Sequence, residues 1–323
     1  MKKTIGENLR ILRLRNNLSM KEAGKQLNLS APGLLKYERN QISPSFEKLE
    51  KFAEVYHTTI NEIMDTEQYN EIKFNNLKLE GLITSVKEEK IKNILRNKID
   101  NYFEILSISD KKLQNKFGVH IINTLEEAES LATKLRIFFT IPVDAPISNL
   151  IYLLESHDMM IITIPQSKDT EGFVGFYETI NNVPIIAVPE ASNGYEQRYN
   201  VAKYLGELLM VSYNNKDALT TRFALSLLIP KQSLINEFGE TRNKIEQKEI
   251  EIYSRIYKVS YKNIIKRLQM CEIITQSNAK YLNININKND LHEQIYTEQA
   301  NNYEKMLYKL IAQGSLKEPE RFK

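Results

Sequence analysis

Two short helices joined by a tight turn constrain the fold of this chain most. Ser19 and Glu22 have the spacing of a capping box, so a helix is expected to begin there and to run to about Leu27. Ser30 can cap the next helix. Pro32 lies in the first turn of that helix, where its missing N–H removes no helical hydrogen bond.

Each of these helices is expected to have a buried face. The residues expected to be buried are Ala23, Leu27, Leu34 and Tyr37. The residues left outward on the second helix are Ala31, Pro32, Gly33, Leu35 and Lys36. This layout is that of a helix-turn-helix, whose second helix enters the major groove of DNA with its N-terminal end first.

The chain resembles the XRE (Cro/C1-type) helix-turn-helix family from about Thr4 to Asp65. The run from Leu34 to Asn40 matches the family's Tyr-Glu-x-Gly region, with Asn40 where glycine is usual; asparagine tolerates a left-handed backbone. Two further helices are expected, one after Ser45 with Phe46, Leu49, Phe52 and Ala53 on one face, and one capped by Thr59 and Glu62. The resemblance implies a five-helix DNA-binding domain in residues 1–66; a scaffold helix-turn-helix that binds no DNA is the alternative.

The outward residues predict the contacts to DNA. Ala31 and Pro32 can touch thymine methyl groups, Gly33 allows close backbone approach, and Lys36 can reach guanine O6 or N7. With Leu35, these are the expected base-contacting residues. The expected phosphate contacts, which position the protein without specifying bases, are Lys21, Arg39, Asn40 and Gln41.

The charge is concentrated at the same end of the chain. Residues 1–41 hold nine Lys or Arg against three acids, a net +6, whereas the whole chain of 323 residues carries only +3. One cysteine, Cys271, excludes an intramolecular disulfide and fits a reducing cytoplasm. No apolar run approaches the roughly 18 residues of a membrane span, and no signal peptide is evident. A cytoplasmic protein of two main domains is expected.

Residues 67–124 have the pattern of a mostly helical connector. Within it, an amphipathic helix is expected from Glu88 to about Ile108. Its apolar stripe comprises Ile91, Leu95, Ile99, Phe103 and Leu106. The stripe can pack on its own chain or form part of a dimer interface, which would place two recognition helices about 34 Å apart.

From Leu125 the pattern mixes helices and strands. Helices are expected at Glu126–Arg136, Ile147–Glu155 and Tyr195–Ser212, and strands at 159–164, 172–177 and 184–188. Asn181 and Asn182 form a hairpin turn signal between the last two strands. The chain is therefore expected to be mainly α with a small β-sheet, an α+β class.

This order of elements resembles the ImmA/IrrE family of zinc metallopeptidases. Residues 198–209 lie over the family's Arg-Phe-Thr-Leu-Ala-His-Glu-Leu-Gly-His-Leu-Leu, and residues 221–230 over Asn-x-Phe-Ala-x-x-Leu-Leu-Met-Pro. Residues 259–261 and 266–268 match the closing helices. The resemblance implies a zincin-like domain at 125–285.

The resemblance also implies that the zinc chemistry is lost. The His-Glu-x-x-His positions hold Lys203, Tyr204 and Glu207. A protonated lysine has no lone pair for a metal, and a phenol is a poor general base. Asp217 lies near the expected third ligand. We therefore expect no metal, no cofactor and no catalysis, with Lys203 and Glu207 as an i, i+4 ion pair. The vacated pocket is either structural core or a sensor for a ligand or partner.

Two C-terminal segments leave alternatives open. Residues 246–274, with Ser260 as a cap, can be a second helix-turn-helix or, as the peptidase resemblance favours, structural packing. Residues 289–312 are expected to form an amphipathic helix with Gly314 as its stop, followed from Glu318 by a loose tail. This region, 286–323, can close the domain, form a dimer or bind a partner.

Together these features predict a repressor of a mobile genetic element, such as a prophage or phage-related island. It would bind a double-stranded DNA operator as a homodimer. An inducing, phage-encoded protein bound by the pseudo-peptidase domain would release it. The alternatives are a metallopeptidase with rearranged ligands that is targeted to DNA, and an autoregulating antitoxin-like interaction protein.

Overall fold

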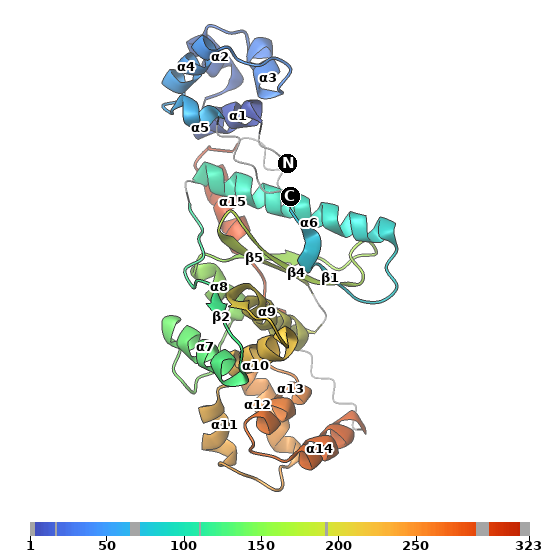
Figure 1. The fold of residues 1–323 in the computed structure, drawn as a ribbon. Helices are drawn as coiled ribbons and strands as arrows, with labels where there is room; N and C mark the ends of the chain where they lie inside the picture. The colour runs from blue at the N-terminus through green and yellow to red at the C-terminus, as the bar shows by residue number, and fades with distance from the viewer. Residues whose placement is uncertain are drawn as a thin grey trace. The chain divides into compact units, whose positions relative to one another are not determined.

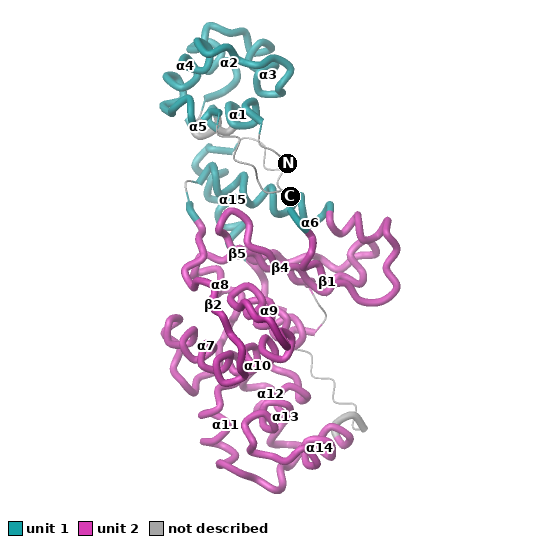
Figure 2. Tube along the Cα trace, in the orientation of Figure 1, with its two compact units in different colours: residues 1–73, 93–112, 301–323 teal, residues 74–92, 113–300 magenta. Residues whose placement is uncertain are grey.

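The computed structural model of the chain describes residues 4–16, 18–64, 72–109, 111–190, 193–288 and 297–316. The chain forms two compact units, which Figure 2 distinguishes by colour. One consists of residues 1–73, 93–112 and 301–323, and the other of residues 74–92 and 113–300. The chain therefore passes between the units four times, and the expected connector at 67–124 is divided between them.

The N-terminal helices form a small domain with its own core (Figure 1). They are α1 (Ile5–Arg15), α2 (Met20–Leu27), α3 (Ala31–Glu38), α4 (Phe46–Val55) and α5 (Ile60–Met64). The core contains Leu9, Ala23, Leu27, Leu34, Phe52 and Ile63, all 0% exposed. The prediction of a five-helix domain with α2 and α3 at these positions is confirmed.

The prediction is wrong for one residue of this core. Phe46 was expected to share the buried face of α4, but 65% of it is exposed. Ser45 is the N-cap, so Phe46 is the first residue of the helix and lies beyond the part of the stripe that packs. Leu49 and Phe52 are buried, as expected. The predicted capping box of α5 falls partly outside the described residues, because the side chain of Glu62 is not described.

Two further helices belong to the first unit, one of them only in part. Helix α6 (Ser85–Ser109) buries the predicted stripe, so these side chains pack within a single chain. Helix α15 (Asn302–Ala312) places the ring of Tyr303 at 5.4 Å from that of Tyr102. The prediction that this helix begins at residue 289 is wrong, because residues 297–301 are not helical, and 289–296 lie outside the described residues. Gly314, at φ +70°, follows the helix as expected.

The second unit is built on a four-stranded sheet in the order β1-β4-β5-β3. The strands are β1 (Lys78–Leu79), β3 (Met160–Ile164), β4 (Phe173–Ile180) and β5 (Val183–Pro189). β4 and β5 are antiparallel and joined at Asn181 and Asn182, whose φ angles are +51° and +61°. β3 is parallel to β5. The predicted strands and hairpin are confirmed, while β1 was not predicted because it is only two residues long.

Eight whole helices, the first turns of a ninth and a second, two-stranded sheet are the other main elements described in this unit. β2 (His120–Ile121) pairs in parallel with β6 (Met210–Val211). The helices wholly within the unit are α7 (Leu125–Phe138), α8 (Leu150–Ser156), α9 (Gly194–Leu209), α10 (Lys216–Leu228), α11 (Lys231–Phe238), α12 (Gln247–Tyr257), α13 (Tyr261–Met270) and α14 (Gln276–Lys288); the ninth is the first turns of α6. A short 3-10 helix, η1 (Phe74–Asn76), precedes β1.

The core of this unit joins helices that are distant in sequence. Leu131 of α7, Leu205 of α9, Phe223 of α10 and Ile264 of α13 belong to one buried cluster. Helices α12 and α13, with Ser260 capping α13, contribute to that core, which agrees with structural packing rather than an exposed second helix-turn-helix. Helix α14 was not predicted. The α+β class is confirmed, and no helix among the described residues meets the length and hydropathy needed to span a membrane.

Candidate nucleic-acid interface

The turn between α2 and α3 is fixed by short-range hydrogen bonds. Ser19 Oγ accepts from the Glu22 amide at 3.3 Å, and the Glu22 carboxylate accepts from the Ser19 amide at 2.8 Å, as a capping box requires. Asn28 ends α2 at φ +55°. The Leu29 amide then donates to Gly24 O at 2.8 Å. A Cβ at Gly24 would lie 2.7 Å from Leu29 O, so the turn requires glycine there.

The N-terminal end of α3 presents a mixed surface of small and basic residues. Ser30 Oγ accepts from the Gly33 amide at 3.1 Å, which caps the helix. Pro32, Leu35 and Lys36 are exposed, and Ala31 and Gly33 are half-buried. The residues predicted to contact bases therefore lie at the outward side of α3, and the contacts themselves stay a prediction.

A buried ion pair holds α1 to the C-terminal end of α3. Arg13 Nε and Nη2 lie 2.6 and 3.1 Å from the two Glu38 carboxylate oxygens, and Arg13 Nη1 donates to Leu18 O at 2.9 Å. Both side chains are less than 10% exposed. Sequence reasoning missed this pair and counted Arg13 only as one of the nine basic residues in residues 1–41. The only signal was the position of Glu38 in the Tyr-Glu run.

Asn40 joins the start of α1 to the end of α3. At φ +55° its backbone is left-handed, as predicted. Its Oδ1 accepts from the Gly6 amide at 2.8 Å, and its Nδ2 donates to Thr4 Oγ1. A Cβ at Gly6 would lie 2.3 Å from Tyr37 O, so α1 and α3 can approach this closely only because residue 6 is glycine. Among the described residues the Asn40 Nδ2 has no second acceptor, so one N–H is left for the predicted phosphate contact.

The other predicted phosphate contacts are accessible. Lys21, Arg39 and Gln41 are exposed, and within the described residues neither Lys21 nor Arg39 has an ion-pair partner. Three apolar side chains are exposed on the same stretch: Leu35 at 36%, Ile42 at 43% and Phe46 at 65%. The surface from α3 to the start of α4 thus combines free cations with apolar groups.

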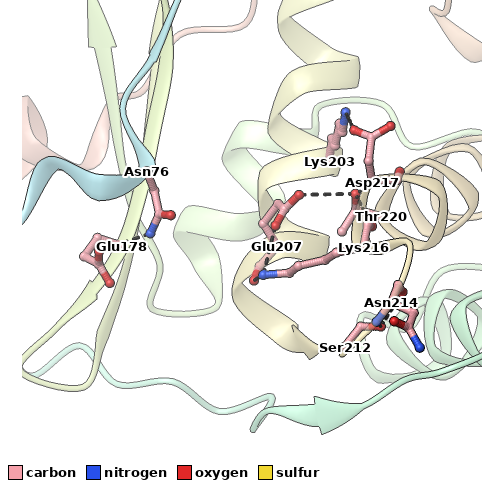
Figure 3. Close-up of polar contacts among 9 residues, drawn as sticks. All are labelled: Asn76, Glu178, Lys203, Glu207, Ser212, Asn214, Lys216, Asp217 and Thr220. Carbon is pink, nitrogen blue, oxygen red and sulfur yellow. Dashed lines mark hydrogen bonds and ion pairs between the residues drawn. The ribbon is translucent and has the colours of Figure 1, made fainter.

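The second predicted site, at α9 and α10, is a cluster of ion pairs (Figure 3). Lys203 Nζ lies 2.6 Å from Asp217 Oδ1, and Lys216 Nζ lies 3.0 Å from Glu207 Oε2. Thr220 Oγ1 donates to Glu207 Oε1 at 3.3 Å. The predicted Lys203–Glu207 pair is therefore wrong, because α10 supplies a closer partner of opposite charge to each residue.

Tyr204 cannot act as an accessible base in this arrangement. It is 5% exposed and stacks on Tyr177 with ring centroids 5.2 Å apart. Gly175 allows this approach, since a Cβ there would lie 2.3 Å from Tyr204 Cε2. Burial, and then the charge of nearby Tyr177, raise the pKa of Tyr204 above its ordinary value. The phenol therefore stays protonated at neutral pH.

The residues at these positions do not fit a zinc ion. Burial lowers the pKa of Lys203, but its hydrogen bond to Asp217 and the neighbouring charges raise the pKa overall, so the ammonium has no lone pair to donate. Glu207 is committed to Lys216 and Thr220. Among the described residues no group of three His, Cys, Asp or Glu has the arrangement of a metal site. Of the four predicted positions, Lys203, Glu207 and Asp217 lie in one polar cluster, and Tyr204 is buried against Tyr177 instead.

Comparison with known proteins identifies the N-terminal domain. Residues 9–63 match a family model described as helix-turn-helix. No curated protein matches the chain. Two solved structures align over 99% of it. Bacillus thuringiensis PlcR in complex with the peptide PapR7 and DNA is 11% identical, covered over 91% of its length, with a TM-score of 0.20. ComR from Streptococcus suis is 14% identical, covered over 92%, with a TM-score of 0.19.

At these TM-scores the two structures support no argument about this fold. The family match supports the helix-turn-helix fold of the N-terminal domain, and it agrees with the caps, turn and core described above. It covers a small part of the chain and says nothing of the second unit. The chain carries an XRE-type helix-turn-helix domain at its N-terminus, and this domain indicates a DNA-binding transcription regulator.

Proposed function

We propose that the protein is a sequence-specific repressor that binds a double-stranded DNA operator as a homodimer. The observation that carries this proposal is the family match at residues 9–63 together with the exposed N-terminal face of α3. Side chains at that end of a recognition helix reach base edges in the major groove. Lys36 is the one long cation among the predicted base contacts, and its Nζ suits guanine O6 or N7.

The second unit is proposed to be a sensor rather than an enzyme. Lys203 and Tyr204 stand where a metal ligand and a general base would be needed, and both are held in ion pairs or ring contacts. A domain without catalytic activity can still bind a partner protein. We propose that an inducing protein, encoded by a phage, binds it and relieves repression of a mobile genetic element in the cytoplasm.

Operator binding tests the proposal. The full chain is titrated into labelled DNA from upstream of its own gene and into random DNA of equal length, by fluorescence anisotropy over a salt series. We expect the operator to bind at least about 10³-fold more tightly than random DNA, with a steep negative salt dependence. Equal and weak binding to both DNAs would refute sequence-specific repression.

A metal assay tests the proposed lack of catalysis separately. Protein purified without chelator is analysed for bound zinc beside a Glu207→Ala variant. We expect no stoichiometric zinc in either, because Glu207 alone does not make a site. Zinc bound one to one and lost from the variant would support the rearranged metallopeptidase instead.

A further inference from the structure

A segment of the second unit that belongs to no helix or strand is bound by its own domain in the way a peptide ligand is bound. Residues 297–300 lie outside any helix or strand. Within this segment, Glu298 contacts Gln197 and Arg198 at the start of α9 and Ile151 in α8. These contacts join residues about 100 to 147 positions apart in the sequence.

The main chain of Glu298 is recognised by a single buried amide. Its N–H donates to Gln197 Oε1 at 2.8 Å, and its carbonyl oxygen accepts from Gln197 Nε2 at 3.1 Å. Nε2 also lies 3.3 Å from Pro189 O at the end of β5. Gln197 is only 1% exposed, so its orientation is fixed. Paired bonds of this kind select an extended backbone and ignore the side chain.

The side chain of Glu298 is recognised by separate groups. Arg198 Nη1 donates to Oε1, and the Ile151 amide donates to Oε2 at 2.8 Å. The Arg198 side chain is 1% exposed and that of Glu298 is 11% exposed. Both carboxylate oxygens are thus satisfied by donors in the domain. An aspartate at this position would be one methylene too short to reach the same donors.

Arg198 needs this carboxylate. Its other hydrogen-bond acceptor is Ile147 O, its Nε has no partner, and Glu298 is the only carboxylate that pairs with it among the described residues. Burial lowers the pKa of Arg198, and the Glu298 charge opposes that shift. A guanidinium so deeply buried is unfavourable without a counter-ion, so this site favours binding of an acidic side chain.

The position of the segment in the chain connects this site to regulation. Residue 300 ends one compact unit and residue 301 begins the other, directly before α15. The contacts of Glu298 therefore attach the chain to the second unit two residues before the chain leaves it. A contact within one domain thus restrains one of the four passages between the units.

We infer that Gln197, Arg198 and the Ile151 amide form a recognition site for an extended peptide segment carrying a glutamate, that residues 297–300 occupy this site in cis, and that a partner protein presenting such a segment displaces them. The inference rests on the proposed partner-relieved repressor for its biological role. The recognition chemistry stands on the contacts alone.

A peptide supplied in trans tests the site. The probe is the labelled peptide Thr-Glu-Gln-Ala-Asn-Asn-Tyr, residues 297–303, blocked at both ends and titrated by anisotropy into the full-length Glu298→Ala variant. We expect this variant to bind it at least tenfold more tightly than the wild-type chain, in which the tethered segment competes at an effective concentration of about millimolar. A peptide with Gln in place of its Glu should bind at least tenfold more weakly.

The matched control is Glu240→Ala, which removes an exposed acid of the same unit and should behave as the wild type. If Glu298→Ala fails to fold by circular dichroism, Glu298→Gln replaces it, since the neutral side chain keeps its length. Peptide binding that is equal in variant and wild type, or that ignores the Gln substitution, would overturn the site.

Operator affinity tests the regulatory part independently. Glu298→Ala, or wild type with a millimolar excess of the peptide, should bind the operator at least tenfold more weakly than wild type alone. Unchanged affinity in both, with the peptide bound, overturns displacement as the route of relief. If wild type does not prefer its operator to random DNA, the proposed function fails, and the peptide titration still decides the site.

Discussion

Two buried arginine–glutamate pairs, Arg13–Glu38 in the first unit and Arg198–Glu298 in the second, differ in the structural elements that they join. Arg13 and Glu38 lie on α1 and α3, so the pair closes the core of a five-helix domain. Arg198 lies on α9, but Glu298 belongs to a segment outside any helix or strand. The first pair can break only if a helix leaves its core, whereas the second can break by release of a short segment. Similar chemistry therefore serves cohesion in the first pair and attachment in the second.

The largest effect is expected on breaking the first pair. Glu38→Ala leaves the Arg13 charge buried, and we expect the helix-turn-helix domain to lose about 3–5 kcal/mol of stability. Hydrogen exchange of α1 and α3 amides in the full chain measures this, because their protection falls with the domain's free energy of unfolding. Glu50→Ala, an exposed acid on α4, is the control and should change less than about 0.5 kcal/mol.

A smaller effect is expected for the second pair. In Glu298→Ala the segment can leave and water can reach Arg198, so we expect a loss of about 1–3 kcal/mol, the range for an unsatisfied buried donor. Faster exchange should be confined to α8 and the start of α9. Exchange that rises throughout the second unit would show that both pairs serve cohesion and would remove the contrast between them.

The first unit, which contains the Arg13–Glu38 pair, is also the unit predicted to contact DNA. Lys36→Ala should reduce discrimination between operator and random DNA by about 1–3 kcal/mol, because it removes a base contact. Lys21→Ala is the matched variant on α2 and should weaken binding to both DNAs alike, as loss of a phosphate contact does. Anisotropy at one fixed salt concentration measures both. An unchanged specificity ratio for Lys36→Ala would contradict its predicted role.

The parts predicted correctly from the sequence depend on residues close together in the chain. The Ser19–Glu22 capping box and the Asn181–Asn182 turn each act within a few residues, so their spacing determines their geometry. The partners missed lie far apart. Glu38 is 25 residues from Arg13, and Glu298 is 100 from Arg198. No local pattern reports such pairs, because the tertiary fold decides which charges meet.

The wrong partner assigned to Lys203 shows the same limit within one helix. Glu207 is its neighbour at i+4, and that spacing permits an ion pair. In the structure α10 lies against α9 and offers Asp217 to Lys203 and Lys216 to Glu207. A pattern of spacing on one helix cannot include a second helix that packs against it. Lys203, Glu207 and Asp217 were predicted to lie near one another, but Lys216 was missed and the pairing was wrong.

The smallest predicted effect tests this pairing. The Asp217 side chain is 84% exposed, so its bond with Lys203 is expected to contribute only about 0.2–1 kcal/mol. The hydrogen bond from Lys203, and then its charge, lower the pKa of Asp217. A lowered folded-state pKa means that this stabilisation is present above the unfolded pKa of aspartate, about 3.9, and is lost as the pH falls through the folded value.

Carboxyl titration by NMR separates the two possible pairings. In Lys203→Ala we expect the pKa of Asp217 to rise toward its ordinary value, because the nearest cation is gone. A double-mutant cycle should give a coupling free energy for Lys203 with Asp217 but a smaller one with Glu207. The reverse order would restore the pair expected from helix spacing. It would also mean that α10 contributes less to this cluster than the 2.6 Å contact between Lys203 and Asp217 indicates.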